Sequence, residues 1–307
     1  MVPQFFDEAA VRSVLRMDEL IEAIEAALIE FSAGRVEQPV RQIVKSHDGF
    51  LGTMPAGGPD VGLGVKLVTF YPDNGALGLH THMAVIALFR PETGEPLAIM
   101  DGRLITEMRT AAASAVATRA LAKPDADTLA ILGTGVQARA HIEALRLVRP
   151  FREVRIWGRN YEKAQRLAEE VGAIATASAE EAVRGADVVV TSTSSAEPVL
   201  SGAWLGSETH VNAVGWSGPH GRELDDDAVR DAFIVADSRE AVLKEAGDIL
   251  IPGAEVHSEI GEVLAGSAVI PEGKRTLFES VGIAVEDVAA ANLVYRRLHG
   301  AGGIASR

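Results

Sequence analysis

The chain has 307 residues, 47% hydrophobic and 23% charged, which is ordinary for a globular enzyme with one large or two modest cores. Its formal net charge of −14, with no run of Lys or Arg, argues against nucleic-acid binding. The lack of cysteine excludes a disulfide framework, a thiolate metal site and a cysteine nucleophile, and fits a reducing cytosol. We expect no signal peptide, membrane span or metal site, and therefore a cytoplasmic protein.

Residues 7–102 predict a helix followed by an antiparallel sheet. Apolar residues recur three or four positions apart through residues 7–34, which predicts one continuous helix that stops at Gly34. Short alternating apolar runs follow, and residues 92–96 form a turn between two of these strands. A second helix, rich in Ala, Ser and Thr, is predicted over residues 103–122, and the predicted domain boundary comes after it.

Strands and helices alternate from Thr128 onward, which is typical of a doubly wound parallel sheet. Near the C-terminus a strand-like run precedes an apolar helix that can fold back onto the first domain. We therefore predict an α/β protein with a Rossmann domain over residues 123–282. A second, α+β domain with an antiparallel sheet is built from residues 1–122 and about 283–307.

A glycine-rich turn lies directly after the first strand of this alternating region. In LAILGTGVQA, Gly133 and Gly135 follow the strand, and Ala138 stands where a third small residue belongs. Such a turn lets backbone N–H groups approach a pyrophosphate, and the helix N-terminus that follows faces the anion. The pattern predicts a dinucleotide site that includes Val136 and Gln137, with a plain tight turn as the alternative.

The end of the next strand indicates which dinucleotide is preferred. A carboxylate there binds both ribose hydroxyls of NAD, whereas an Arg accommodates a 2′-phosphate. This chain has Gly158, Arg159 and Asn160 at the strand end and no carboxylate. The sequence therefore favours NADPH over NADH, unless Arg159 is simply a solvated loop residue.

Four motifs, together spanning nearly the whole chain, resemble the ornithine cyclodeaminase/mu-crystallin family. They are MPA followed by GVKLVTFYPDN, MDGRLITEMRTAAASAVA, GTGVQA and SVGIAVEDVAAA. The resemblance implies a Rossmann domain joined to a substrate-binding and dimerisation domain, and thus a homodimer. The family includes cyclodeaminases, an alanine dehydrogenase type, and ketimine or Δ1-pyrroline-2-carboxylate reductases. It therefore implies action on small α-amino or α-imino acids through a nicotinamide cofactor.

The resemblance also identifies candidate catalytic residues. It assigns Arg41 and Arg109 to the substrate carboxylate, which a planar guanidinium can hold by two hydrogen bonds. The alternatives are a charge at a strand end for Arg41 and a helix-surface ion pair with Glu107 or a neighbouring residue for Arg109. Lys66 matches the family's catalytic lysine and lies in an apolar strand, where desolvation lowers its pKa toward the range useful for proton transfer. A solvent-facing lysine is the alternative.

Further residues are expected to contact the two ligands. On the substrate side these are Met54, His82 and Ser217, although His82 can equally be a structural histidine. The expected cofactor contacts are Thr110, Gly133, Gly135, Val136, Gln137, Arg159, Asn160, Thr191, Ser192, Val214 and Gly282.

The segment NAVGWSGPHGREL departs from the cyclodeaminase pattern. By the resemblance, cyclodeaminases have a water-activating Asp after this strand and a Lys soon after it, where this chain has Ser217 and Gly221. They also carry a Glu just before the Met-Pro pair, where this chain has Gly52 and Thr53. The general base for attack by water is therefore missing. Reduction of an imine needs only a hydride, a proton and a held carboxylate.

We therefore predict NADPH-dependent reduction of a small α-imino acid to the amino acid, with Lys66 as acid/base. The imino acid is a ketimine, of Δ1-pyrroline-2-carboxylate type, or the imine of a 2-oxoacid. One alternative is an NAD-dependent ornithine-type cyclodeaminase that uses Glu223 or His220 as its base. The other is an NADP(H)-dependent small-ligand-binding protein.

Overall fold

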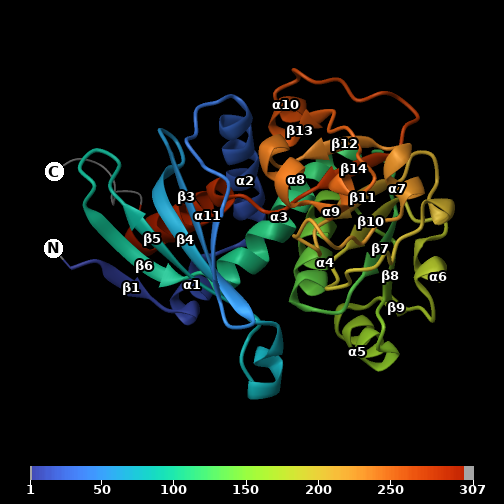
Figure 1. Ribbon diagram of the computed structural model, residues 1–307, viewed down its shortest axis with the longest axis horizontal. Helices are drawn as coiled ribbons and strands as arrows, with labels where there is room; N and C mark the ends of the chain where they lie inside the picture. Colours follow the sequence, from blue (N-terminus) through green and yellow to red (C-terminus); the bar gives the residue numbers. More distant parts are fainter. Residues whose placement is uncertain (1, 301–307) are drawn as a thin grey trace. The chain divides into compact units, whose positions relative to one another are not determined.

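The computed structural model describes residues 2–300, and these divide into two units whose elements are labelled in Figure 1. The first unit takes the chain up to Arg109 and again from Ile283 onward. The second unit runs from Thr110 to Gly282.

The first division falls inside helix α3 (Arg103–Leu121), whereas the sequence predicted it after residue 122. The second half of this helix is bonded to the second unit. Ser114 Oγ lies 2.9 Å from His141 Nε2, and the Asn212 side chain donates to Thr118 Oγ1 over 3.0 Å. These buried polar contacts, which local sequence patterns do not reveal, bind residues 110–121 to the second unit.

A six-stranded sheet forms the first unit, in the order β1-β6-β5-β4-β3-β2. Its strands are β1 (Gln4–Phe6), β2 (Gln42–Ser46), β3 (Gly49–Gly58), β4 (Gly62–Phe70), β5 (His82–Phe89) and β6 (Pro96–Asp101). Strands β2 to β6 pair with one another in antiparallel fashion, which confirms the predicted antiparallel sheet. The short strand β1, which the sequence did not predict, pairs with β6 in parallel and makes the sheet mixed.

The predicted single helix over residues 7–34 is wrong. The structure has two helices, α1 (Glu8–Val14) and α2 (Met17–Ser32), with Leu15 and Arg16 extended between them. Leu15 is 6% exposed and Met17 is 4% exposed. Residues two apart lie about 200° apart around a helix, so a continuous helix would turn one of them to solvent. The break lets both be buried.

The two faces of the first sheet differ in their surroundings. The covered face carries Met54, Lys66, Ile86 and Met100, all buried, and helix α11 (Ala284–His299) packs on β3, β4 and β5. The opposite face, called the outer face below, carries apolar side chains that are 36–70% exposed. They are Phe5, Val44, Leu51, Leu63, Leu67, Met83, Val85 and Ile99. A short 3₁₀ helix, η1 (Pro72–Leu77), links β4 to β5.

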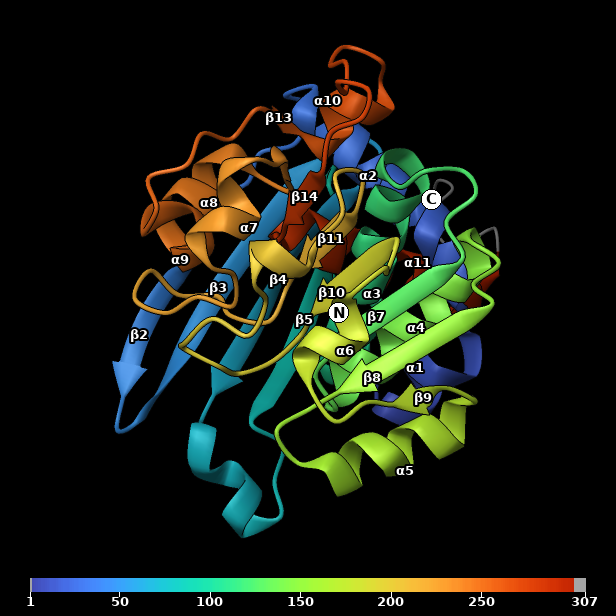
Figure 2. The same cartoon turned by 90° about the vertical axis from the view of Figure 1, so that its right-hand side faces the viewer.

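An eight-stranded parallel sheet forms the second unit, and several of its strands are seen side by side in Figure 2. In sheet order the strands are β13 (Ser258–Glu259), β12 (Phe233–Ala236), β14 (Thr276–Glu279), β11 (His210–Ala213), β10 (Val188–Thr191), β7 (Thr128–Leu132), β8 (Glu153–Trp157) and β9 (Ile174–Ala175). The strand order reverses between β7 and β10. In open α/β sheets such a reversal marks the crevice where ligands bind. This confirms the predicted Rossmann fold.

The remaining helices of the second unit connect these strands. They are α4 (Val136–Val148), α5 (Tyr161–Val171), α6 (Ala179–Val183), η2 (Gly202–Trp204), α7 (Asp226–Arg230), α8 (Arg239–Glu245), α9 (Gly247–Leu250) and α10 (Ile260–Leu264). Within residues 2–300, no helix combines the length and the apolar character that crossing a membrane requires.

Candidate active site

Lys66 lies near the middle of β4, on the covered face of the first sheet. It pairs in register with Met54 of β3, and only 1% of it is exposed. Its ammonium nitrogen lies 2.6 Å from Asp287 Oδ2. Burial lowers the pKa of Lys66 to about 8; the charge of Asp287 opposes this, and those of Arg109 and Arg41 add to it. An amine with this pKa can hold or release a proton near neutral pH.

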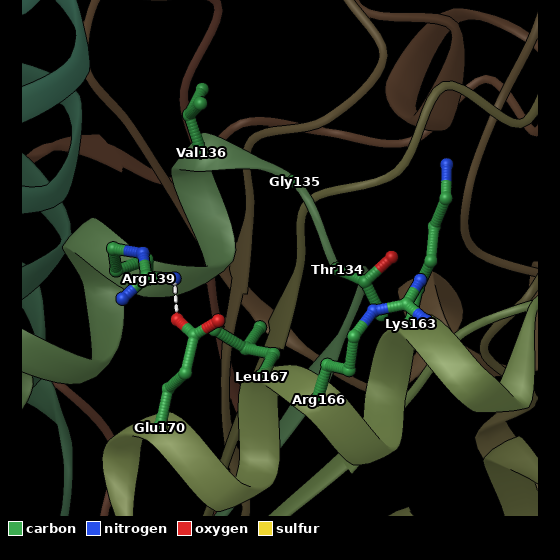
Figure 3. A pocket seen from close by; sticks show the side chains of 8 residues that line it. All are labelled: Thr134, Gly135, Val136, Arg139, Lys163, Arg166, Leu167 and Glu170. Atoms are coloured by element: carbon green, nitrogen blue, oxygen red, sulfur yellow. Dashed lines mark hydrogen bonds and ion pairs between the residues drawn. The ribbon is translucent and has the colours of Figure 1, made fainter.

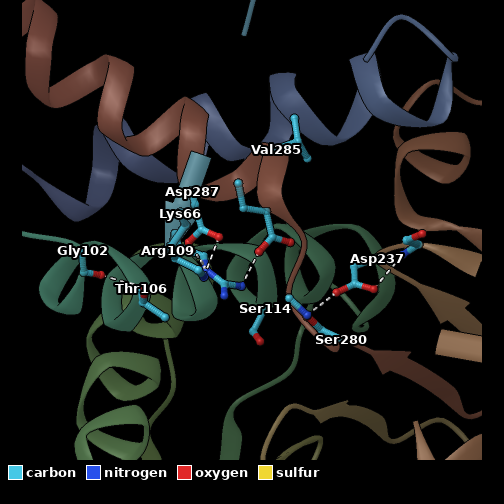
Figure 4. A network of polar contacts seen from close by, with 12 residues as sticks. Lys66, Gly102, Thr106, Arg109, Ser114, Asp237, Ser280, Val285 and Asp287 are labelled. Atoms are coloured by element: carbon cyan, nitrogen blue, oxygen red, sulfur yellow. Dashed lines mark hydrogen bonds and ion pairs between the residues drawn. The ribbon is translucent and has the colours of Figure 1, made fainter. Parts of the chain in front are cut away.

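Arg109, in the first half of α3, binds an acidic pair at the start of α11 (Figure 4). Its Nη1 lies 2.5 Å from Glu286 Oε2, and its Nε donates to Asp287 Oδ1 over 3.0 Å. Both carboxylates are fully buried, so each of the buried cations has a counter-charge. The alternative of an ion pair on the helix surface is wrong, because Arg109 is only 5% exposed and its guanidinium binds the buried Glu286 and Asp287.

Glu286 and Asp287 were not among the residues predicted from the sequence. Their partner Arg109 lies 177 and 178 positions away, so no local spacing connects them. One signal was available: two adjacent acids stand between Val285 and Val288 in a helix that is otherwise rich in Ala and Val. Acidic residues flanked by apolar ones in a helix indicate burial, and buried acids need cationic partners.

Arg41 and His82 lie at strand starts within electrostatic range of Lys66. Arg41 directly precedes β2, is half-buried, and contributes to lowering the pKa of Lys66. His82 begins β5 opposite Phe70, and the two ring centroids are 4.6 Å apart. Desolvation, followed by the charge of Lys66, lowers the pKa of His82. The first unit thus brings three sequence-predicted residues, Arg41, His82 and Arg109, near the buried ammonium of the fourth, Lys66.

The glycine turn between β7 and α4 has the geometry that a pyrophosphate requires. Gly133 has φ +136°, and a Cβ there would lie 2.6 Å from Ser192 O, so only glycine fits. Gly135 precedes α4 and has no atom near its missing Cβ. Within residues 2–300 no side chain caps α4, so the first N–H groups of this helix, at Val136 and Gln137, are open to an anion.

Other predicted cofactor contacts lie at the carboxyl ends of neighbouring strands. Thr191 ends β10 and is fully buried, and its carbonyl accepts from Val214 N over 3.0 Å. Ser192 N donates to the end of β7 over 2.8 Å. At the end of the second unit, Gly282 has φ +75° and donates its N–H to Asp237 over 2.7 Å. Thr110, also a predicted contact, lies in α3 and is 9% exposed.

The end of β8 carries no carboxylate, because Gly158, Arg159 and Asn160 follow the strand. A Cβ at Gly158 would lie 2.6 Å from the methyl group of Thr134. Asn160 caps α5, because its Oδ1 accepts from Lys163 N over 2.9 Å. Arg159 is exposed. The structure therefore gives Asn160 a capping role that the sequence analysis did not anticipate.

The loop after β11 folds on itself. Trp216 Nε1 donates to Gly218 O over 3.0 Å, and a Cβ at Gly221 would lie 2.4 Å from the Trp216 ring. Gly221 therefore leaves room for the indole, which packs within its own loop. Ser217 and His220 are exposed.

Glu223 joins this loop to the one after β10. Its Oε1 accepts from both Thr193 N (2.7 Å) and Thr193 Oγ1 (2.5 Å), and its Oε2 accepts from Gly215 N over 2.9 Å. The residue is fully buried, and burial raises its pKa. Both oxygens of Glu223 are thus engaged in holding loops, which argues against its use as a substitute base. Among residues 2–300, no group of three or more His, Cys, Asp or Glu is arranged to hold a metal ion.

Known proteins resemble this chain over nearly its whole length. The profile of the ornithine cyclodeaminase/mu-crystallin family matches residues 1–302, as the sequence motifs predicted. Ketimine reductase mu-crystallin of Mus musculus is 47% identical over 95% of this chain and 96% of its own. The structure of Thermococcus litoralis Δ1-pyrroline-2-carboxylate reductase with NADH and L-proline has 37% identity and a TM-score of 0.92, covering 99% of this chain and 100% of its own. An archaeal alanine dehydrogenase, described as a dimer with bound NAD, has 34% identity and a TM-score of 0.92, covering 97% of each chain.

Proposed function

Because the chain belongs to the ornithine cyclodeaminase/mu-crystallin family, we propose that it reduces a small α-imino acid to the amino acid with a nicotinamide coenzyme. The names of its relatives, a ketimine reductase and a Δ1-pyrroline-2-carboxylate reductase, support this reaction class. The observation that carries the proposal is the buried Lys66, whose pKa of about 8 suits a proton donor to an imine.

The roles of the residues follow from their charges. Arg41 and Arg109 hold the substrate carboxylate, and this fixes the α-carbon and the imine nitrogen in place. Lys66, in its ammonium form, donates a proton to the nitrogen. Asp287 keeps the ammonium in place through the 2.6 Å ion pair. The reduced nicotinamide supplies the hydride to the α-carbon. In the reverse direction, neutral Lys66 takes the proton back.

The coenzyme of this reaction is NADPH. Gly133 and Gly135 leave the backbone open for the pyrophosphate, so the residues present fit a dinucleotide. Gly158 offers no carboxylate to the ribose hydroxyls, and a side chain at this position would have to displace the Thr134 methyl group. Arg159, next in the chain, supplies a positive charge for a 2′-phosphate.

Cyclodeamination is less well supported than reduction. It needs a base to activate water, and Ser217 stands where the family's Asp would be. Glu223 is held by three hydrogen bonds, which leaves exposed His220 as the remaining candidate. No observation favours a binding protein without catalysis. Burying a lysine destabilises the fold, and simple ligand binding does not need a lysine of lowered pKa.

The direct test is oxidation of NADPH with a panel of five- and six-membered cyclic ketimine carboxylates and with 2-oxoacids plus amines. We expect turnover with at least one of them and formation of the corresponding amino acid. Release of ammonia from ornithine, without net use of coenzyme, would instead establish cyclodeamination. No turnover with any substrate would contradict the proposed reaction.

We further propose that the protein is a homodimer built through the outer face of the first sheet. This face exposes a continuous set of apolar side chains across β1 to β6, which would be costly to leave in water. The archaeal alanine dehydrogenase of similar structure is described as a dimer.

Val85→Glu, in β5, should therefore yield a monomer, because it puts a charge in the apolar interface. Sedimentation equilibrium would measure the mass. Leu243→Glu is the matched control, since Leu243 is also exposed, at 46% against 40% for Val85, but lies on α8 in the second unit. A Val85→Glu protein that stays dimeric would exclude this face as the interface.

A further inference from the structure

A pocket of about 340 Å³ opens between the glycine turn and helix α5 (Figure 3). The turn and the start of α4 supply one side of it, and α5 supplies the other. Its lining residues are Thr134, Gly135, Val136, Arg139, Lys163, Arg166, Leu167 and Glu170. The pocket therefore adjoins the backbone that receives the pyrophosphate, on the side of the β8 end.

Two of the three cations in this pocket lack a counter-charge. Arg139 is paired with Glu170, as the dashed line in Figure 3 shows, so these two charges compensate each other. Among the described residues, the side chains of Lys163 and Arg166 have neither an ion-pair nor a hydrogen-bonding partner. Both are exposed and stand on the same side of α5, three residues apart. The pocket thus presents about two unpaired positive charges.

The position of these charges indicates which anion they bind. In a Rossmann fold the adenosine ribose lies at the end of the second strand, here β8, beside the glycine turn. Thr134 is the residue between the two glycines, and its methyl group lies over Gly158. A phosphate on the 2′-oxygen of the ribose carries nearly two negative charges, which match one ammonium and one guanidinium.

We propose that Lys163 and Arg166 bind the 2′-phosphate of NADPH, and that the Thr134 hydroxyl faces the same group. This rests on the proposed reductase function and names the residues that would select its coenzyme. Asn160 was a sequence-based candidate for a cofactor contact, but its side-chain oxygen caps α5. Lys163 and Arg166, which lie within α5, thus add to the positive charge that Arg159 supplies for the 2′-phosphate.

The test uses ligand fragments, so that it does not depend on catalysis. Isothermal titration of the full chain would compare adenosine 2′,5′-bisphosphate with 5′-AMP, and NADPH with NADH. Losing one charge-assisted contact should weaken binding about tenfold. We therefore expect Lys163→Ala and Arg166→Ala each to raise the dissociation constants of the bisphosphate and of NADPH about tenfold. The dissociation constants of AMP and NADH should change by less than about twofold.

Lys244→Ala serves as the matched control, because it removes one exposed positive charge from α8, where Lys244 pairs with Glu240. It should leave all four dissociation constants unchanged. Unchanged bisphosphate binding in both α5 variants would overturn the inference, and so would equal weakening of bisphosphate and AMP. The proposed function fails separately, if the wild-type protein discriminates between the fragments yet reduces no imino acid.

Discussion

Lys66→Met should abolish imino-acid reduction while leaving coenzyme binding intact. Methionine has a similar length and volume, so the covered face of the sheet stays filled, but the proton donor is lost. General acid catalysis is worth about 10²–10⁴-fold, and we expect a fall in kcat/KM of about 10³-fold. Steady-state kinetics would measure this change, and titration would show a dissociation constant for NADPH within about twofold of the wild type.

Lys45→Met, on exposed strand β2, is the control and should keep full activity. A Lys66→Met protein that retains more than about a tenth of the activity would show that the proton comes from elsewhere, for example from water.

The pH dependence of the wild type tests the same role. Burial lowers the pKa of Lys66 to about 8, and the donor must be protonated. Reduction should therefore be constant below this pH and fall above it, by about tenfold per unit, as the ammonium is lost. Oxidation of the amino acid should show the opposite trend and rise toward pH 8. An upper limb near the ordinary lysine value of 10.5 would contradict the lowered pKa.

Asp287→Asn should have the second large effect, on stability and on the pH profile together. The substitution leaves the buried Lys66 ammonium without its counter-charge and weakens the hold on Arg109. Breaking a buried pair from one side costs about 3–5 kcal/mol, which urea denaturation would measure as a lower free energy of unfolding. Because the charge of Asp287 raises the pKa of Lys66, its removal should also move the upper pH limb below 8.

Glu286→Gln is the informative comparison for this prediction. Glu286 binds Arg109 but is not among the main causes of the Lys66 pKa. Glu286→Gln should raise the substrate KM, and the pH above which reduction falls should stay near 8. If both variants lose stability and neither moves the limb, the acidic pair is purely structural, and Asp287 has no part in setting the protonation of Lys66.

Local patterns predicted the second unit well because its defining features are short-range. Gly133 and Gly135 sit between a buried strand and a helix within ten residues, and the turn they form requires no distant contact. The helix break at Leu15 and Arg16 was missed for the opposite reason. A helical period continues through these residues, and only packing against the rest of the first unit decides that both Leu15 and Met17 are buried.

The candidate site shows the same division. By itself the sequence determined the fold class, the dinucleotide turn and a lysine within an apolar strand, because each depends on a pattern of neighbouring residues. Only the tertiary structure decided which charges face Lys66. Asp287 and Glu286 reach the lysine and Arg109 across most of the chain, and Lys163 and Arg166 face the glycine turn because α5 packs beside it. Charged groups interact according to their distance in space, and the separation of two residues in the sequence does not reveal that distance.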